Sequence, residues 1–182
     1  MRAEKTIFDN AWVFMPTRHG DLRGWFCEAY KEGQIESLLG LDFKYNFIQD
    51  NQSLSMSSGT IRGFHYQEEP FAQTKLVQCV TGSIYDAIVD LRPGSPTFGK
   101  WQSFFLSAEN GAQLLVPKGF GHGICTLEDN TRVFYKVDNP YSKEHDKGII
   151  WNDPDLKVDW PFKNVTISEK DSKHPTMKEV FG

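Results

Sequence analysis

The feature that most limits the fold of this chain is a series of short β-type segments with almost no helix between them. Each segment is rich in Val, Ile, Phe and Tyr and is bounded by Gly, Pro, Asn or Asp, as strands between turns are. The predicted strands are 6–14, 45–50, 60–67, 75–80, 83–91, 100–107, 112–117, 123–127 and 131–137. Strands at such regular spacing predict an all-β sandwich or barrel.

Three local patterns refine this prediction. Residues 36–40 read as the end of a short helix that Gly40 caps, and this is the only persuasive helix in the first two thirds of the chain. Thr81-Gly82 predicts a tight hairpin between the strands on either side of it. The irregular tail with Trp151 and Trp160 is expected to pack against the barrel rather than to form a new domain.

Alternation along 83–91 divides that strand into two faces. Tyr85, Ala87 and Val89 share one face, while Asp86 and Asp90 share the other. We expect the face with the two carboxylates to be polar or wet.

Composition sets the class of protein. A chain of 182 residues that is 39% hydrophobic and 24% charged suits a single domain over 1–182 with a sizeable core. A net charge of -4 argues against nucleic acid as a partner. Cys27, Cys79 and Cys125 are widely spaced and form no CxxC, so we expect reduced thiols and no zinc knuckle. No apolar run suggests a signal peptide or a membrane span, so a soluble cytoplasmic protein is expected.

Polar groups of complementary type gather between residues 49 and 78. Arg62, His65 and Lys75 lie on two neighbouring predicted strands. Two cations can hold an anionic substrate, and an imidazole between them can accept a proton near neutral pH. Strict alternation puts Arg62 and His65 on opposite faces, so both can line one cavity only if the strand bulges, which we expect at Gly63.

Several motifs resemble one family of enzymes. GTIRGFHYQ, AQTKLVQCVTGSIYDAIVDLRPGSPTFGKW, LSAENGAQLLVPKGFGHG, FYKVDNPYS, IIWNDPDLKVDWP and ISEKD are similar, in this order, to the dTDP-4-dehydrorhamnose 3,5-epimerase family. The resemblance runs from about Arg23 to Asp171. It implies a cupin-type jelly-roll barrel, a homodimer with an exchanged amino-terminal segment, and no metal or other cofactor. The implied substrate is a dTDP-linked 4-keto-6-deoxy sugar.

The resemblance also implies catalytic roles. A ketone at carbon 4 acidifies the hydrogens on carbons 3 and 5, so one base can act at both through an enolate. His65, paired with Asp171, matches the family's base, and Tyr135 matches its proton donor. Lys75 matches the positive partner of the enolate oxygen.

The resemblance further implies a set of substrate contacts. They are Arg23, Glu28, Gln49, Asp50, Asn51, Arg62, His122, Asp146 and Lys170. Asp146 stands where the family has a glutamate. His145 and His174 have no assigned role.

Three alternatives remain open from the sequence. A metal-dependent cupin enzyme would need a second histidine where Gln67 follows His65 in HYQ, so its usual ligand set is broken. A sugar-binding jelly roll without chemistry would need no base. An epimerase acting at carbon 3 alone or carbon 5 alone, or on another nucleotide sugar, would carry similar motifs.

Overall fold

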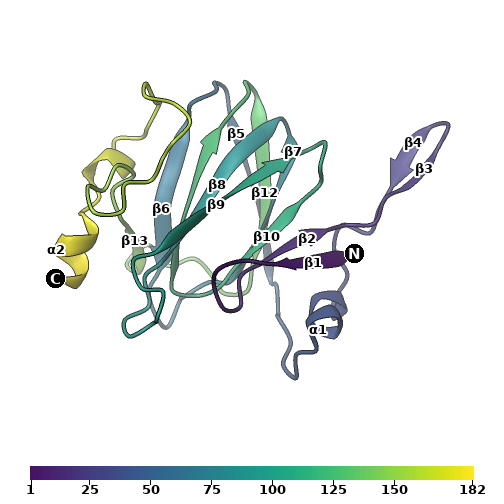
Figure 1. The fold of residues 1–182 in the computed structure, drawn as a ribbon, viewed down its shortest axis with the longest axis horizontal. Coiled ribbons are helices and arrows are strands. Elements are labelled where there is room, and N and C mark those ends of the chain that lie inside the picture. Colours follow the sequence, from purple (N-terminus) through teal and green to yellow (C-terminus); the bar gives the residue numbers. More distant parts are fainter.

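Two antiparallel sheets face each other in the computed structural model, which describes residues 1–182 (Figure 1). The first sheet has the order β1 (Arg2–Lys5), β2 (Trp12–Met15), β10 (Gln113–Val116), β7 (Lys75–Thr81), β12 (Thr131–Val137) and β5 (Gln49–Ser55). The second has the order β13 (Asp146–Gly148), β6 (Ile61–Gln67), β11 (Phe120–Thr126), β8 (Ser83–Asp90) and β9 (Trp101–Ser107). The all-β jelly roll expected from the sequence is confirmed.

The remaining elements lie at the two sides of the barrel. Strands β3 (His19–Asp21) and β4 (Gly24–Phe26) form a separate hairpin that projects away from the sheets (Figure 1). Helix α1 (Gln34–Leu39) ends at Gly40, whose φ of 67° is left-handed, as its predicted cap requires. The 3-10 helix η1 (Asp171–Lys173) and helix α2 (Met177–Phe181) lie on the opposite side. Neither α-helix has the length and apolar character needed to cross a bilayer.

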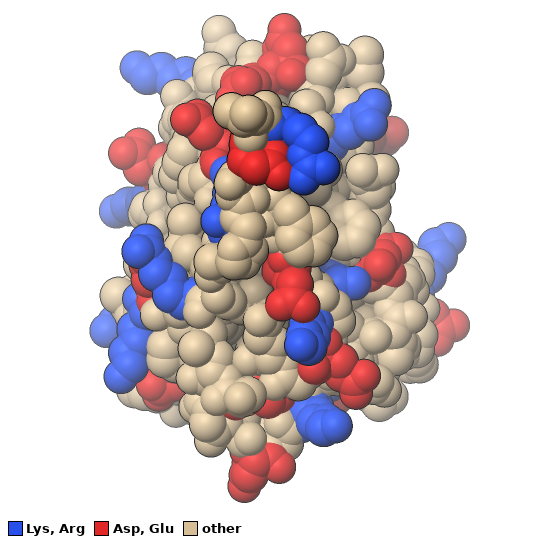
Figure 2. All heavy atoms as spheres, turned by 90° about the vertical axis from the view of Figure 1, so that its right-hand side faces the viewer, with Lys and Arg blue, Asp and Glu red and all other residues tan.

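Charged side chains of both signs share the face from which the hairpin projects. Figure 2 shows lysine and arginine interspersed with aspartate and glutamate over this face.

Both faces of β8, in the second sheet, are buried. Between the sheets, Ile84 and Ile88 pack with Val77 and Leu114 of the first sheet. On the outer face, the residues that alternate with them pack against the tail, in a cluster of Phe64, Ala87, Val89, Leu91, Ile149 and Leu156. The Trp160 ring lies 5.5 Å from that of Phe64, between centroids. The expected packing of the tail against the barrel is therefore confirmed.

Burial on both faces corrects the prediction for the two aspartates of β8. Asp86 and Asp90 do share a face, but each is 0% exposed rather than wet. Burial raises the pKa of Asp90, but hydrogen bonds from Arg92, Ser95 and Thr97 outweigh burial and hold it at about 2. Alternation thus separates the faces of a strand correctly and says nothing about what covers them.

Two strand predictions at the amino-terminal side are also wrong. Residues 6–14 form no single strand, because the chain turns at Asn10, whose φ of 67° is left-handed, and β1 and β2 pair antiparallel. The predicted strand 45–50 begins at Gln49 instead. Tyr45 and Phe47 pack with helix α1 rather than in a sheet.

The predicted hairpin at Thr81-Gly82 is wrong as well. β7 lies in the first sheet and β8 in the second, so this turn carries the chain from one sheet to the other. Gly82 has a left-handed φ of 74°. This conformation suits a hairpin turn and a turn between sheets equally well. Turn residues therefore mark the reversal without revealing which strands pair.

The bulge expected at Gly63 is confirmed. His122 of β11 pairs with His65 of β6, but Ile124 pairs with Arg62, so the two residues between them on β6 lie opposite one residue of β11. The φ of Gly63 is 131°, and a Cβ there would lie 2.5 Å from Gly123 Cα and 2.6 Å from the carbonyl oxygen of His122. Only glycine fits this close approach of two backbones.

The Gly63→Ala substitution should therefore destabilise the barrel. We expect a loss of at least about 2 kcal/mol in the free energy of unfolding, since the methyl group meets backbone and the φ is unfavourable. Urea unfolding at a fixed protein concentration measures this loss. Gly20→Ala is the matched control, because its Cβ would have its nearest contact at 3.6 Å. Equal stabilities of the two variants would contradict the assigned bulge.

Candidate active site

A cavity of about 510 Å³ lies among side chains of both sheets and of the tail. Its walls are formed by Ser53, Thr60, Ile61, Arg62, His65, Lys75, His122, Ile124, Val133, Tyr135, Thr166, Ile167, Ser168 and Asp171. All four predicted catalytic residues are in this set. The bulge in β6 brings Arg62 and His65 to the same cavity.

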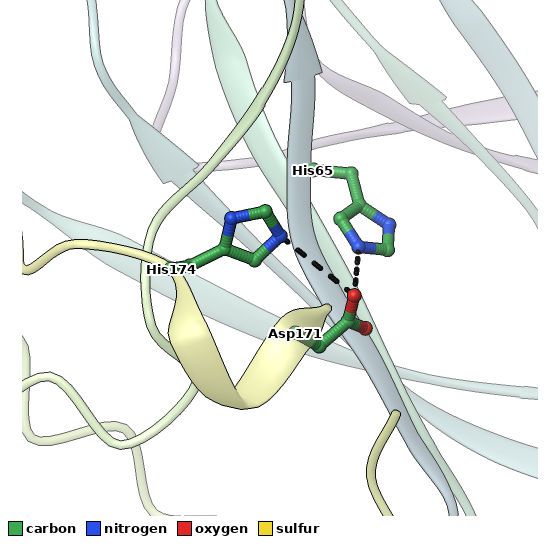
Figure 3. A group of neighbouring side chains, drawn as sticks. All are labelled: His65, Asp171 and His174. Carbon is green, nitrogen blue, oxygen red and sulfur yellow. Dashed lines mark hydrogen bonds and ion pairs between the residues drawn. The ribbon is translucent and has the colours of Figure 1, made fainter. Parts of the chain in front are cut away.

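His65 and Asp171 form a hydrogen-bonded pair (Figure 3). His65 Nε2 lies 2.8 Å from Asp171 Oδ1, and Asp171 Oδ2 accepts the backbone N–H of Gly63 at 3.1 Å. Burial raises the pKa of Asp171, but the hydrogen bond from His65 and its charge outweigh burial and lower the pKa to about 2. The ionised carboxylate accepts a hydrogen bond from the N–H at Nε2, so Nδ1 of a neutral His65 carries no proton and can act as an acceptor.

Tyr135 and Lys75 come from the opposite sheet. They lie on β12 and β7, whereas His65 lies on β6. Because the two sheets face each other, His65 and Tyr135 reach the cavity from opposite walls. Burial raises the pKa of Tyr135, so its hydroxyl is protonated at neutral pH.

Lys75 places a positive charge beside the pair. Its Nζ lies 3.5 Å from the carbonyl oxygen of His65. Burial lowers the pKa of Lys75 to about 8, against the opposing effect of Asp146 and Asp86. The ammonium form therefore still predominates at pH 7.

A second histidine, His122, lines the same cavity and is held from behind by a buried carboxylate. His122 Nε2 lies 2.9 Å and 3.0 Å from the two carboxylate oxygens of Asp86. His122 is also the cross-strand neighbour of His65. Asp86, which the sequence placed on a wet face, is thus the buried support of a histidine in the cavity.

A smaller hollow of about 220 Å³ adjoins the cavity and shares His65, Lys75 and Tyr135 with it. Asp146 lines this hollow and accepts hydrogen bonds from Tyr141 Oη at 2.9 Å and Lys170 Nζ at 2.5 Å.

The other predicted contact residues are not among the residues that line either space. Gln49 and Asn51 lie on β5, at the edge of the first sheet, and Gln49 Nε2 donates to Asn51 Oδ1 at 2.7 Å. Asp50 points to the other face of β5 and pairs with Lys136 at 2.8 Å. Arg23 and Glu28 lie at the projecting hairpin and just after it, where Arg23 pairs with Asp21. One chain alone does not bring these two residues to the cavity.

Sequence reasoning missed part of the lining. Ser53 follows from alternation with Gln49 and Asn51 along one strand. Thr166 and Ser168 come from the irregular tail, where no periodic pattern marks a buried face. His174, which lies beside Asp171, also carried no signal.

Comparisons with known proteins identify the family. The family profile described as dTDP-4-dehydrorhamnose 3,5-epimerase matches residues 5–179. A dTDP-4-dehydrorhamnose 3,5-epimerase from Sinorhizobium fredii is 49% identical over 169 residues, covering 92% of this chain and 85% of its own. One from Shigella flexneri is 46% identical over 171 residues, covering 94% and 93%.

A solved structure agrees with these relatives. The crystal structure of the Bacillus anthracis dTDP-4-dehydrorhamnose 3,5-epimerase, with TDP and pyrophosphate bound, superposes with a TM-score of 0.92 at 49% identity and covers 96% of this chain and 98% of its own. The protein is thus an isomerase, and the chain belongs to the dTDP-4-dehydrorhamnose 3,5-epimerase family.

Proposed function

We propose that this enzyme inverts carbons 3 and 5 of dTDP-4-dehydro-6-deoxy-D-glucose and so forms dTDP-4-dehydro-L-rhamnose. The observation that carries the proposal is the arrival of His65 and Tyr135 in one cavity from opposite sheets. An epimerase must remove a proton from one face of a sugar ring and return a proton to the other. A base and an acid on opposite walls suit that requirement.

His65 is the base in this mechanism. Its Nδ1 takes the proton from carbon 3 or carbon 5, and the electron pair of the broken bond forms an enolate with the ketone at carbon 4. The negative charge develops on the enolate oxygen, which the ammonium of Lys75 stabilises. Asp171 keeps the His65 proton on Nε2 and stabilises the imidazolium that forms.

Tyr135 is the acid. Its hydroxyl donates a proton to the carbon from the face opposite His65, and the enolate returns to the ketone. The histidine then loses a proton to solvent and the phenolate regains one, which completes the cycle. Because burial raises the pKa of Tyr135, its hydroxyl is protonated again before the next turnover.

Nucleotide and sugar binding is assigned to polar groups around the cavity. Arg62 is held by hydrogen bonds of 3.2 Å to Ser55 Oγ and 3.1 Å to the Leu54 carbonyl, and its guanidinium suits a diphosphate. His122, Lys170 and Asp146 complete the contacts within one chain. Gln49, Asp50 and Asn51 form the adjoining edge of the first sheet.

We assign Arg23 and Glu28 to the site of a second copy in a homodimer. The side chain of Arg23 is 90% exposed on a hairpin that stands clear of its own barrel. Leu22, Trp25 and Phe26 of this hairpin are exposed apolar residues. A segment with this character is suited to lie against a partner subunit.

The His65→Ala variant should lose solvent exchange at carbons 3 and 5 together, by roughly two to four orders of magnitude, because one base serves both carbons. Proton NMR of the keto sugar in deuterated water follows both positions at once. Binding of dTDP should change little. Asp171→Asn should reduce exchange less. Normal exchange at either carbon in His65→Ala would remove His65 from that step.

The Tyr135→Phe variant should separate exchange from inversion. His65 can still deprotonate the sugar and return deuterium from its own side, so exchange with retention should persist. Inversion should fall by roughly two to four orders of magnitude, since the positioned acid is lost. Product stereochemistry by NMR measures the difference. Tyr141→Phe is the matched control, and inversion at the normal rate in Tyr135→Phe would transfer the role to another group.

Mixed dimers test the shared site. Arg23→Ala and His65→Ala proteins should each be inactive, and refolding an equal mixture should restore about a quarter of the activity, because some sites receive both intact residues. Each variant refolded alone is the control. A monomer in light scattering, or a mixture no more active than its parents, would show that each site belongs to one chain.

A further inference from the structure

His174 is a buried histidine beside the base that the proposed mechanism does not use. Its side chain is 10% exposed, and Nε2 has no hydrogen-bond partner. The ring packs over Gly148, where a Cβ would lie 2.5 Å from Nε2. The distance from Nε2 to Asp171 Oδ1 is 3.7 Å, which is too long for a hydrogen bond. A buried polar atom aimed at a carboxylate without bonding to it requires an explanation.

Two imidazoles converge on this carboxylate. His65 Nε2 lies 2.8 Å and His174 Nε2 lies 3.7 Å from the same atom, Asp171 Oδ1 (Figure 3). One ligand atom from each of the three residues lies within 4.8 Å of the others. Donor atoms around a tetrahedral zinc ion lie about 3.4 Å apart, given Zn–N bonds of about 2.1 Å. The observed separations lie on either side of this value.

We propose that His65, Asp171 and His174 form a site for one divalent transition-metal ion of the Zn²⁺ class, and that ion binding switches the enzyme off. Two imidazole nitrogens and one carboxylate oxygen are the ligands that such ions prefer. Water or an anion would fill the remaining position. The metal-binding part stands on the geometry alone, whereas the inhibition rests on the proposed role of His65.

Inhibition follows from the tautomer of His65. The ion takes Nε2, which carries the proton in the free enzyme, so the proton of the neutral ring moves to Nδ1. Nδ1 is the atom that must accept the proton of the substrate. No proton is lost overall, yet the ring no longer has a free acceptor. This ion is therefore an inhibitor, in contrast to the ion of a metal-dependent cupin enzyme.

Zinc titration of the chelator-treated, full-length enzyme tests the site. Calorimetry should give one ion per chain, and His174→Gln should weaken binding at least about tenfold, the lower end of what the loss of a supporting group around a metal costs. His145→Gln is the matched control, because His145 bonds to Ser142, its ring packs at a tilt against Phe71, and it is not one of the three clustered residues. Equal zinc affinity in wild type and His174→Gln, or no binding at millimolar zinc, would overturn the site.

Activity supplies the second measurement. The zinc concentration that halves wild-type activity should rise at least about tenfold in His174→Gln, each protein compared with its own zinc-free rate, and EDTA should restore the activity of both. Zinc bound at this cluster with full activity would overturn the inhibition. A wrong assignment of His65 as the base would be seen in a different experiment. In that case the His65→Ala variant, free of zinc, would still exchange the hydrogens on carbons 3 and 5 at the normal rate.

Nitrogen NMR of the histidines in the wild-type protein tests the site without any substitution, so the result does not depend on the folding of a variant. Zinc should shift Nε2 of His65 and His174 and leave His145 unchanged. Shifts confined to other histidines would overturn the assignment.

Discussion

One carboxylate, that of Asp171, joins strand β6 to the tail, two parts of the molecule that are far apart in the sequence. One oxygen accepts the ring N–H of His65, and the other accepts the backbone N–H of Gly63 at the bulge. The residue itself begins η1, in the tail that covers the outer face of the second sheet. The strand irregularity, the orientation of His65 and the start of η1 therefore share one group.

The buried Asp86 and the cavity residue Arg62 are tolerated because each has a hydrogen-bond partner. Asp86 is completely buried but accepts two contacts from His122. Arg62 is tied to the strand opposite through Ser55. A buried charge without such partners would cost several kcal/mol. The cavity thus presents side chains that are already held in place before a substrate arrives.

Much of the architecture follows from local patterns, and the failures have physical causes. Strand period and turn residues predict the all-β fold, and the need to bring Arg62 and His65 to one side predicts the bulge. The hairpin predicted at Thr81-Gly82 is wrong because the residues of a tight turn do not determine whether the two flanking strands belong to the same sheet. His65 and Asp171 are 106 positions apart, so only a family resemblance could pair them from the sequence. His174 was missed because packing over Gly148, rather than any periodicity, sets its position.

The position of Asp171 after β13, the last strand of the barrel, has a consequence for how the chain is made. During synthesis, every strand of both sheets leaves the ribosome before this residue does. All strands of the barrel therefore precede, in the sequence, the carboxylate that hydrogen-bonds to His65. The proposed base thus obtains its hydrogen-bond partner only when the tail has docked on the barrel.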